Sequence, residues 1–425
     1  MHVHLHTDFA DNPAAQEAAA LTSACVHCGF CLATCPTYLD NRDERDSPRG
    51  RIYLIKSLLE TGSGEAAVET HLDRCLTCRS CETTCPSGVA YVRIADAGRR
   101  LVDHRDTRPM TARSLRWLLR QIVPRPALFT PLLRLGQYLR GVMPAEVRQH
   151  IPPRQQRLRV QSGRLPRRMV LLQGCVQRAA TPRTNDAARL VFARLGIELV
   201  FAAGETCCGA VNHHLGAHDA ALANMRRTVD VIWPHIENGA EAIISSATGC
   251  GVQIADYGRL LSDNPDYAEK AARISGMTLD IAEALNKEAL ESLPLRPAVV
   301  PIAVHIPCSQ QHGMRQPDTV SRLMASCGYR LADTRDDHLC CGSAGTYSIL
   351  QPATSRRLRM RKVTALEVAH PERIVTSNVG CQLHLAAAAG VPVVHWIECI
   401  AEDLQAQQSP PANEHLLATS SDINS

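Results

Sequence analysis

Cysteine spacing is the feature that most limits what this chain can fold into. The 425 residues include 18 cysteines, and all except Cys327 and Cys399 belong to two pairs of repeated motifs. Neighbouring cysteines such as Cys340 and Cys341 make a poor disulfide, because the backbone between them must strain to join the sulfurs. The chain shows no apolar leader at its beginning and no apolar stretch near the ~18 residues of a membrane-spanning helix. We therefore expect a cytoplasmic, reduced protein whose cysteines serve metal or redox chemistry.

The N-terminal motif has the spacing C-x2-C-x2-C-x3-C-P and occurs twice, first as CVHCGFCLATCP and then as CLTCRSCETTCP. Three cysteines at three-residue intervals can wrap one cuboidal cluster, whereas the fourth, before proline, reaches the other cluster, as in two-cluster bacterial ferredoxins. A pair of zinc sites is the alternative, but four cysteines followed by proline, used twice, favour two [4Fe–4S] clusters. The predicted ligands are Cys25, Cys28, Cys31 and Cys85 for cluster 1, and Cys75, Cys78, Cys81 and Cys35 for cluster 2.

The second pair of repeats is longer and contains an adjacent cysteine pair in each copy. The first set is Cys175, Cys207, Cys208 and Cys250, and the second is Cys308, Cys340, Cys341 and Cys381. The interval from a cysteine of the first set to its counterpart is identical for the first three members and nearly identical for the last, which indicates an internal duplication. Adjacent cysteines can hold different irons of one cluster, so we predict a further iron–sulfur cluster in at least one repeat. A zinc site or a purely structural role is the alternative.

Each long repeat alternates apolar strand patterns with helical patterns. Strand patterns end near the cysteines, as in MVLLQGC at 169–175 and AIISSATGC at 242–250, and TNDAARLVFARLG at 184–196 is typical of the helices between them. This alternation predicts parallel sheets, whose carboxyl edges bind ligands. The predicted fold class is therefore a multidomain chain of mixed α+β and α/β type. A helical two-cluster domain similar to bacterial ferredoxin precedes two duplicated α/β modules with parallel sheets.

These patterns divide the chain into six segments. They are a flexible N-terminus (1–19), the two-cluster domain (20–102), an arginine- and proline-rich connector (103–168), the first cysteine-rich module (169–295), the second module (296–401) and a disordered tail (402–425). Fourteen arginines and one acidic residue, Glu146, lie between 108 and 168, with apolar runs such as SLRWLLRQIV. One or two amphipathic helices there would lie on an anionic membrane surface or on a partner, or form a solvated face over the protein's own domains.

The order of these motifs resembles the iron–sulfur subunits of bacterial glycolate oxidase, which contain CCG domains. The likeness covers roughly residues 20–400 and runs through CVHCGFCLATCPTY, SPRGRIYLIKSLLE, HLDRCLTCRSCETTCPSGV and both CCG motifs. It implies that separate flavoprotein subunits oxidise glycolate to glyoxylate, and D-lactate as well, so that no catalytic residue is expected in this chain. It also implies that this subunit passes electrons to the membrane quinone pool or another acceptor. The basic amphipathic connector is in turn suited to a peripheral position on the cytoplasmic face of the inner membrane. The chain has no G-x-G-x-x-G motif between a strand and a helix, in agreement with a relay subunit.

Two related families share this plan and remain open as alternatives: the iron–sulfur subunit of anaerobic glycerol-3-phosphate dehydrogenase and a catalytic subunit like that of heterodisulfide reductase. In heterodisulfide reductase the module ends in C-x2-C, whereas Gln253 and His384 stand at the second cysteine's position here. That departure puts the unusual cluster of heterodisulfide reductase in doubt for this chain. The net charge of +4 is too small to indicate nucleic-acid binding, and we expect no nucleic-acid partner.

Overall fold

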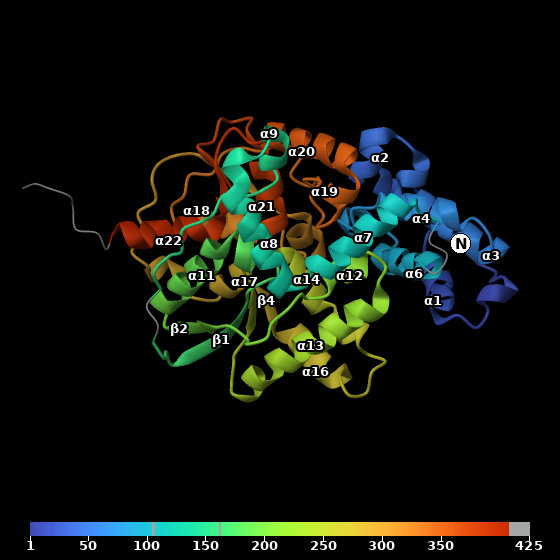
Figure 1. Cartoon of the computed structure of the whole chain (residues 1–425), viewed down its shortest axis with the longest axis horizontal. Coiled ribbons are helices and arrows are strands. Elements are labelled where there is room, and N and C mark those ends of the chain that lie inside the picture. Colours follow the sequence, from blue (N-terminus) through green and yellow to red (C-terminus); the bar gives the residue numbers. More distant parts are fainter. Residues whose placement is uncertain (104–106, 161–162, 408–425) are drawn as a thin grey trace, which may run out of the picture.

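Three parts follow one another in the computed structural model of the chain, which describes residues 1–103, 107–160 and 163–407 (Figure 1). The N-terminal part is helical and lies at one end of the long axis of the molecule. A pair of connector helices then crosses to a larger half that contains two parallel sheets. The predicted fold class is confirmed.

The N-terminal part has its own apolar core between four helices: α1 (Pro13–Thr22), α3 (Pro48–Thr61), α4 (Glu65–Asp73) and α6 (Tyr91–Asp103). Helix α3 shows why the sequence folds this way locally. Ser47 accepts a hydrogen bond from the backbone N–H of Gly50, Pro48 occupies the first helical position, and Gly62 ends the helix with a φ of 68°. Short helices α2 (Pro36–Asn41) and α5 (Ser80–Thr84) lie in or directly after the cysteine motifs.

The first residues of the chain differ from the predicted flexible segment over 1–19. Helix α1 buries Ala15 and Ala18 completely against the N-terminal core. The terminal amino group donates to the carbonyl of Ser23, and the His6 N–H donates to the carbonyl of Leu59. The segment therefore belongs to the N-terminal domain, because its small alanine side chains let α1 pack closely on α6.

The first cysteine-rich module is built on four parallel strands in the spatial order β2-β1-β3-β4. The strands are β1 (Arg167–Leu172), β2 (Ile197–Val200), β3 (Ile243–Ser245) and β4 (Thr278–Asp280). Helices α11 (Pro182–Arg194) and α17 (Ile281–Leu285) share one core with the sheet, while α13 (His218–Glu237), α14 (Thr248–Ala255) and α16 (Ala268–Met277) belong to a second core. The remaining helices of this module are α10 (Gln177–Ala180), α12 (Ala210–His214) and α15 (Tyr257–Leu260).

The second module has a sheet of three parallel strands in the spatial order β5-β6-β7. The strands are β5 (Ile302–His305), β6 (Arg373–Thr376) and β7 (Val393–His395). The segment before Cys340 and Cys341 pairs with this sheet through one parallel bridge, between Ile302 and Leu331. Its helices are α18 (Thr319–Ser326), α19 (Tyr347–Leu350), α20 (Pro352–Leu366), α21 (Val379–Ala386) and α22 (Trp396–Ala406), with a π-helical turn over Ser309–Gly313.

The two modules share one apolar core. Helix α11 of the first module packs on α22, the last helix of the second module, and α18 of the second module packs on α17, the last α-helix of the first. Polar contacts join the same surfaces: Thr184 donates to Glu398 at 2.6 Å, and the His395 ring lies 3.0 Å from the carbonyl of Ser246. The duplicated halves therefore form one body rather than two independent units.

The connector contains two helices, α7 (Met110–Ile122) and α8 (Pro126–Leu139), and the short α9 (Ala145–Arg148) follows them (Figure 1). The predicted tail over 402–425 begins too early, because α22 continues to Ala406, and residues 408–425 lie outside the described part of the chain. Among the described residues, no helix combines the length and the apolar character that a bilayer-spanning segment needs.

Candidate metal centres

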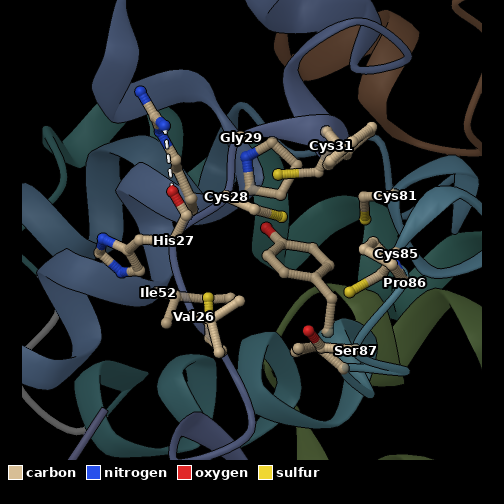
Figure 2. A pocket seen from close by; sticks show the side chains of 16 residues that line it. Val26, His27, Cys28, Gly29, Cys31, Ile52, Cys81, Cys85, Pro86 and Ser87 are labelled. Carbon is tan, nitrogen blue, oxygen red and sulfur yellow. Dashed lines mark hydrogen bonds between the residues drawn. The ribbon is translucent and has the colours of Figure 1, made fainter.

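Two neighbouring pockets in the N-terminal part collect the cysteines of the repeated motif. The outer pocket, of about 430 Å³, lies between the first motif and the end of the second. Figure 2 shows the sulfur atoms of Cys28, Cys31, Cys81 and Cys85 around a common space. Cys25 also lines this pocket, so the structure brings together the four residues predicted for cluster 1.

The inner pocket, of about 300 Å³, contains all four residues predicted for cluster 2. Its cysteines are Cys35, Cys75, Cys78 and Cys81. Cys81 and Tyr91 line both pockets, and Tyr91 donates a hydrogen bond to the sulfur of Cys75 at 3.4 Å. The two sites are therefore separated by little more than single side chains.

The backbone of each motif curls in the same unusual way. The residues between the first three cysteines adopt positive φ angles at matching positions, 56° at His27 and 84° at Gly29, then 53° at Thr77 and 62° at Arg79. A positive φ at a residue other than glycine costs free energy and persists where the surroundings impose it. Loops of this shape turn their cysteines inward, and thiolates are the ligands that iron–sulfur clusters use. The donor set and the loop shape fit one cluster in each pocket.

Two buried arginines supply positive charge to the inner pocket. Arg51, 1% exposed, donates to the carbonyl of His71 and to the hydroxyl of Thr37, and Arg99 donates to Thr77 at 3.0 Å. Burial alone would raise the pKa of Cys75, but the charges of Arg51 and Arg99 lower it below its usual value. The inner pocket is thus prepared for a negatively charged occupant. The cysteine motif carries no signal for these arginines, which lie outside it along the chain.

Cys78 and Cys81 of the inner pocket lie in a different electrostatic environment from Cys75. Burial raises the pKa of Cys78 and of Cys81 well above the usual value. Thiolates at these positions therefore need a bound cation to stabilise them. Their chemistry is that of metal ligands rather than of free nucleophiles.

The cysteines of the first module gather at the carboxyl edge of its sheet. Cys175 follows β1 and Cys250 lies in the first turn of α14, after β3, so the two flank the point where the strand order reverses. Cys207 hydrogen-bonds to Cys175 and Cys208, which lowers its pKa well below the usual value. All four thiols, including Cys250, belong to or pack against the apolar core beneath α13.

The cysteines of the second module form the same arrangement in two close pairs. The sulfurs of Cys308 and Cys340 are 3.8 Å apart, and those of Cys341 and Cys381 are 3.3 Å apart. Cys78 of the inner pocket packs with Cys308 and Cys340 in one small apolar cluster. The second module therefore brings its thiols directly against the inner pocket.

Polar contacts fix the N-terminal part on both modules. Arg79, between Cys78 and Cys81, forms an ion pair with Asp256 of the first module. Thr83 hydrogen-bonds to His312 of the second module at 2.8 Å. The residues at these contacts lie next to the cysteine motifs, so the sulfur sites of all three parts are held in a fixed relation.

Comparisons with known proteins agree with this architecture. A family model described as "4Fe-4S dicluster domain" matches residues 22–89, and one described as "Cysteine-rich domain" matches residues 169–255 and 302–386. The glycolate oxidase iron-sulfur subunit of Escherichia coli (strain K12) is 46% identical over 406 residues, which cover 95% of this chain and 100% of that protein. The chain belongs to the family of glycolate oxidase iron–sulfur subunits.

More distant relatives match most of the chain or about half of it. A probable glycolate oxidase iron-sulfur subunit of Bacillus subtilis (strain 168) is 26% identical over 394 residues, covering 85% of this chain and 87% of that protein. Lactate utilization protein A of the same organism is 25% identical over 217 residues, covering 49% of this chain and 87% of that protein. The resemblance drawn from the sequence is confirmed, and membership of the glycolate oxidase iron–sulfur subunit family supports an electron-transfer role in a complex of several subunits.

Proposed function

We propose that this chain carries electrons from flavoprotein subunits, which oxidise glycolate to glyoxylate and D-lactate as a second substrate, to a quinone-type acceptor. The observation that carries the proposal is the row of sulfur-lined sites from the surface to the interior. The outer pocket, the inner pocket and the thiols of the second module follow one another, with Cys81 and Cys78 at the two junctions. The relatives' names supply the substrate.

In this proposal Cys25, Cys28, Cys31 and Cys85 hold one [4Fe–4S] cluster, and Cys75, Cys78, Cys81 and Cys35 hold the other. When bound, such clusters accept and release single electrons. The chain's own residues provide the remaining properties. Arg51 and Arg99 offset negative charge at the inner pocket, Tyr91 fixes the sulfur of Cys75, and the buried surroundings exclude water.

We also propose that electrons enter at the outer pocket, because its rim is both apolar and accessible. Val26, Phe30 and Tyr53 are 68%, 61% and 57% exposed, and Cys28 is exposed beside them. Large apolar side chains of this kind gather at surfaces that bind other proteins. A flavoprotein subunit seated there would face the outer site directly.

The connector helices carry a different surface, for which we propose peripheral attachment to the cytoplasmic face of the inner membrane. Leu128, Leu132, Leu135 and Leu139 follow one face of α8 and are 38–55% exposed, and Trp117 of α7 is 61% exposed. Six arginines and no acidic residue lie between 110 and 142. An apolar stripe with flanking cations is suited to an anionic lipid surface.

The relay is tested with Cys28→Ser in the complete complex, purified without oxygen. We expect loss of one cluster signal in electron paramagnetic resonance and loss of dye reduction downstream, while glycolate still reduces the flavin. Cys327→Ser is the matched control, because Cys327 belongs to neither cysteine repeat.

The outcomes separate the relay from its alternatives. Undiminished electron flow in Cys28→Ser would contradict the relay. Substrate turnover by this chain without its partners would favour a catalytic subunit like that of heterodisulfide reductase. Two [4Fe–4S] clusters correspond to about eight irons per chain, and a larger count indicates a further cluster in the cysteine-rich modules.

A further inference from the structure

The two cysteine-rich modules have equivalent sets of four cysteines, but the buried residue at the end of the first strand differs between the modules. His305 is the last residue of β5, and Leu172 is the last residue of β1. His305 precedes Cys308 by the same interval as Leu172 precedes Cys175. The strand register gives the same equivalence, because Leu172 pairs with Ser245 of β3 and His305 pairs with Thr376 of β6. The second module thus has an imidazole where the first has an isobutyl group.

That imidazole is placed against the thiols. A ring nitrogen of His305 and the sulfurs of Cys341 and Cys381 all lie within 4.8 Å of one another. His305 is 2% exposed, and its Nδ1 is 2.9 Å from the hydroxyl of Thr376. A hydrogen bond of this kind fixes the orientation of a metal-binding imidazole and leaves the other nitrogen, Nε2, for the metal.

A second difference concerns charge. Lys362 is 2% exposed and donates to the carbonyl of Asp336, close enough to Cys340 and Cys341 to interact with both electrostatically. The equivalent position of the first module is Val229, one helical turn after Met225, just as Lys362 comes one turn after Leu358. Met225 and Leu358 correspond because each lies against the glycine of its own CCG motif. A buried cation stabilises a negatively charged metal–thiolate group, whereas Val229 gives no such support.

We infer that the second module, and not the first, holds an iron-containing centre bound by cysteine thiolates and by the imidazole of His305. Its ligands would be Cys308, Cys340, Cys341, Cys381 and His305. Four sulfurs in two close pairs and one imidazole make five donors, which exceed the four that a zinc ion takes. Imidazole ligation raises the potential of a thiolate-bound cluster. The inference deepens the proposed relay, on which it rests, by giving the inner cluster an acceptor beyond Cys78.

Pulsed electron paramagnetic resonance on the full-length chain, purified without oxygen and reduced, tests the nitrogen ligand without any substitution. Protein labelled with ¹⁵N-histidine is compared with unlabelled protein. We expect more than about eight irons per chain, and a signal distinct from those of the two N-terminal clusters whose nitrogen coupling changes from ¹⁴N to ¹⁵N. The comparison reports on the ligand rather than on activity.

Two pairs of variants test the asymmetry between the modules. His305→Leu, which installs the residue of the first module, should abolish the nitrogen coupling, and Leu172→Met is its matched control. Cys340→Ser should lower the iron content toward about eight per chain, whereas the equivalent Cys207→Ser should leave it unchanged.

Several results would overturn the inference. They are nitrogen coupling that persists in His305→Leu, equal iron loss in Cys207→Ser and Cys340→Ser, or zinc without iron in the second module. Absence of the two N-terminal cluster signals would instead refute the relay itself. Presence of both, with about eight irons and no histidine coupling, would leave the relay intact and refute this inference alone.

Discussion

Asp280 is a fully buried carboxyl at the end of β4 in the first module. One of its oxygens accepts a hydrogen bond from the N–H of Ala282 at 2.8 Å, and the other has no partner among the described residues. Burial raises the pKa of Asp280 to about 7. Between the ordinary value of ~3.9 and about 7, the folded protein holds a proton that the unfolded chain has released. Its stability therefore falls as the pH rises through this interval.

Asp280→Asn removes the free-energy cost of ionising a buried carboxyl, while the amide keeps an oxygen that can cap α17. The free energy of unfolding of the variant minus that of the original protein should rise as the pH is raised from 4 to 8, by at most ~4 kcal/mol. Anaerobic thermal unfolding at several pH values measures the change. The exposed Asp266→Asn is the matched control and should follow the original protein. Parallel curves for Asp280→Asn and the original protein would show that the carboxyl is charged in the folded state.

At the scale of single elements, local patterns predicted most of what the structure shows. The motif C-x2-C-x2-C-x3-C-P places three cysteines on one curled loop, so its spacing alone indicates which thiols share a pocket. Long helices such as α11 and α13 follow from their apolar periodicity. The short strands β4 and β7 were not predicted, because three residues carry too little pattern to distinguish a strand from a loop.

Other features depend on contacts that no local pattern encodes. The N-terminal segment forms helix α1 because it packs on α6. Helix α22 continues to Ala406 because it packs on α11. Arg51 lines the inner pocket, and Arg99 reaches Thr77 beside it, only when α3 and α6 assemble there. His305 becomes a candidate metal ligand only because the fold brings it close to Cys381, which lies far along the chain, after β6. Long-range packing of this kind explains why these residues were missed.

Helix α8 gives an element-scale test of membrane attachment. Leu132→Glu combined with Leu135→Glu places two charges on its exposed apolar stripe, where they oppose insertion among lipids. We expect binding to vesicles that contain phosphatidylglycerol to weaken at least ~10-fold, which corresponds to ~1.4 kcal/mol. Vesicle co-sedimentation of the full-length chain at low and moderate salt measures this effect.

The control for α8 is Val299→Glu, because Val299 is 83% exposed and lies just before β5, outside the connector segment of the chain. Equal vesicle binding by the double variant and the original chain would exclude α8 as the attachment surface. Unchanged vesicle binding together with loss of complex formation would assign the stripe to a partner subunit instead.

At the scale of the whole molecule, the N-terminal part has two sources of stability. The residues around α3 and α6 form an apolar core in which Ile55, Leu58, Leu59 and Ile94 are completely buried. The cysteine loops contribute Cys25 and Cys81 to this core, but they also hold His27, Thr77 and Arg79 at positive φ. Such residues cost of order 1–3 kcal/mol each, and a bound cluster would offset that cost in the loops.

Removal of iron should therefore loosen the cysteine loops and spare the rest of the molecule. After anaerobic chelation, we expect backbone amides in 25–35 and 75–85 to exchange with solvent at least ~10-fold faster, while those of α6 and β5 keep their protection. Reconstitution with iron and sulfide should restore the original rates. Equal loss of protection in β5 would mean that the clusters hold the whole molecule together. Unchanged exchange in both loops would mean that the loops keep their shape without metal, and the positive φ angles would then need another cause.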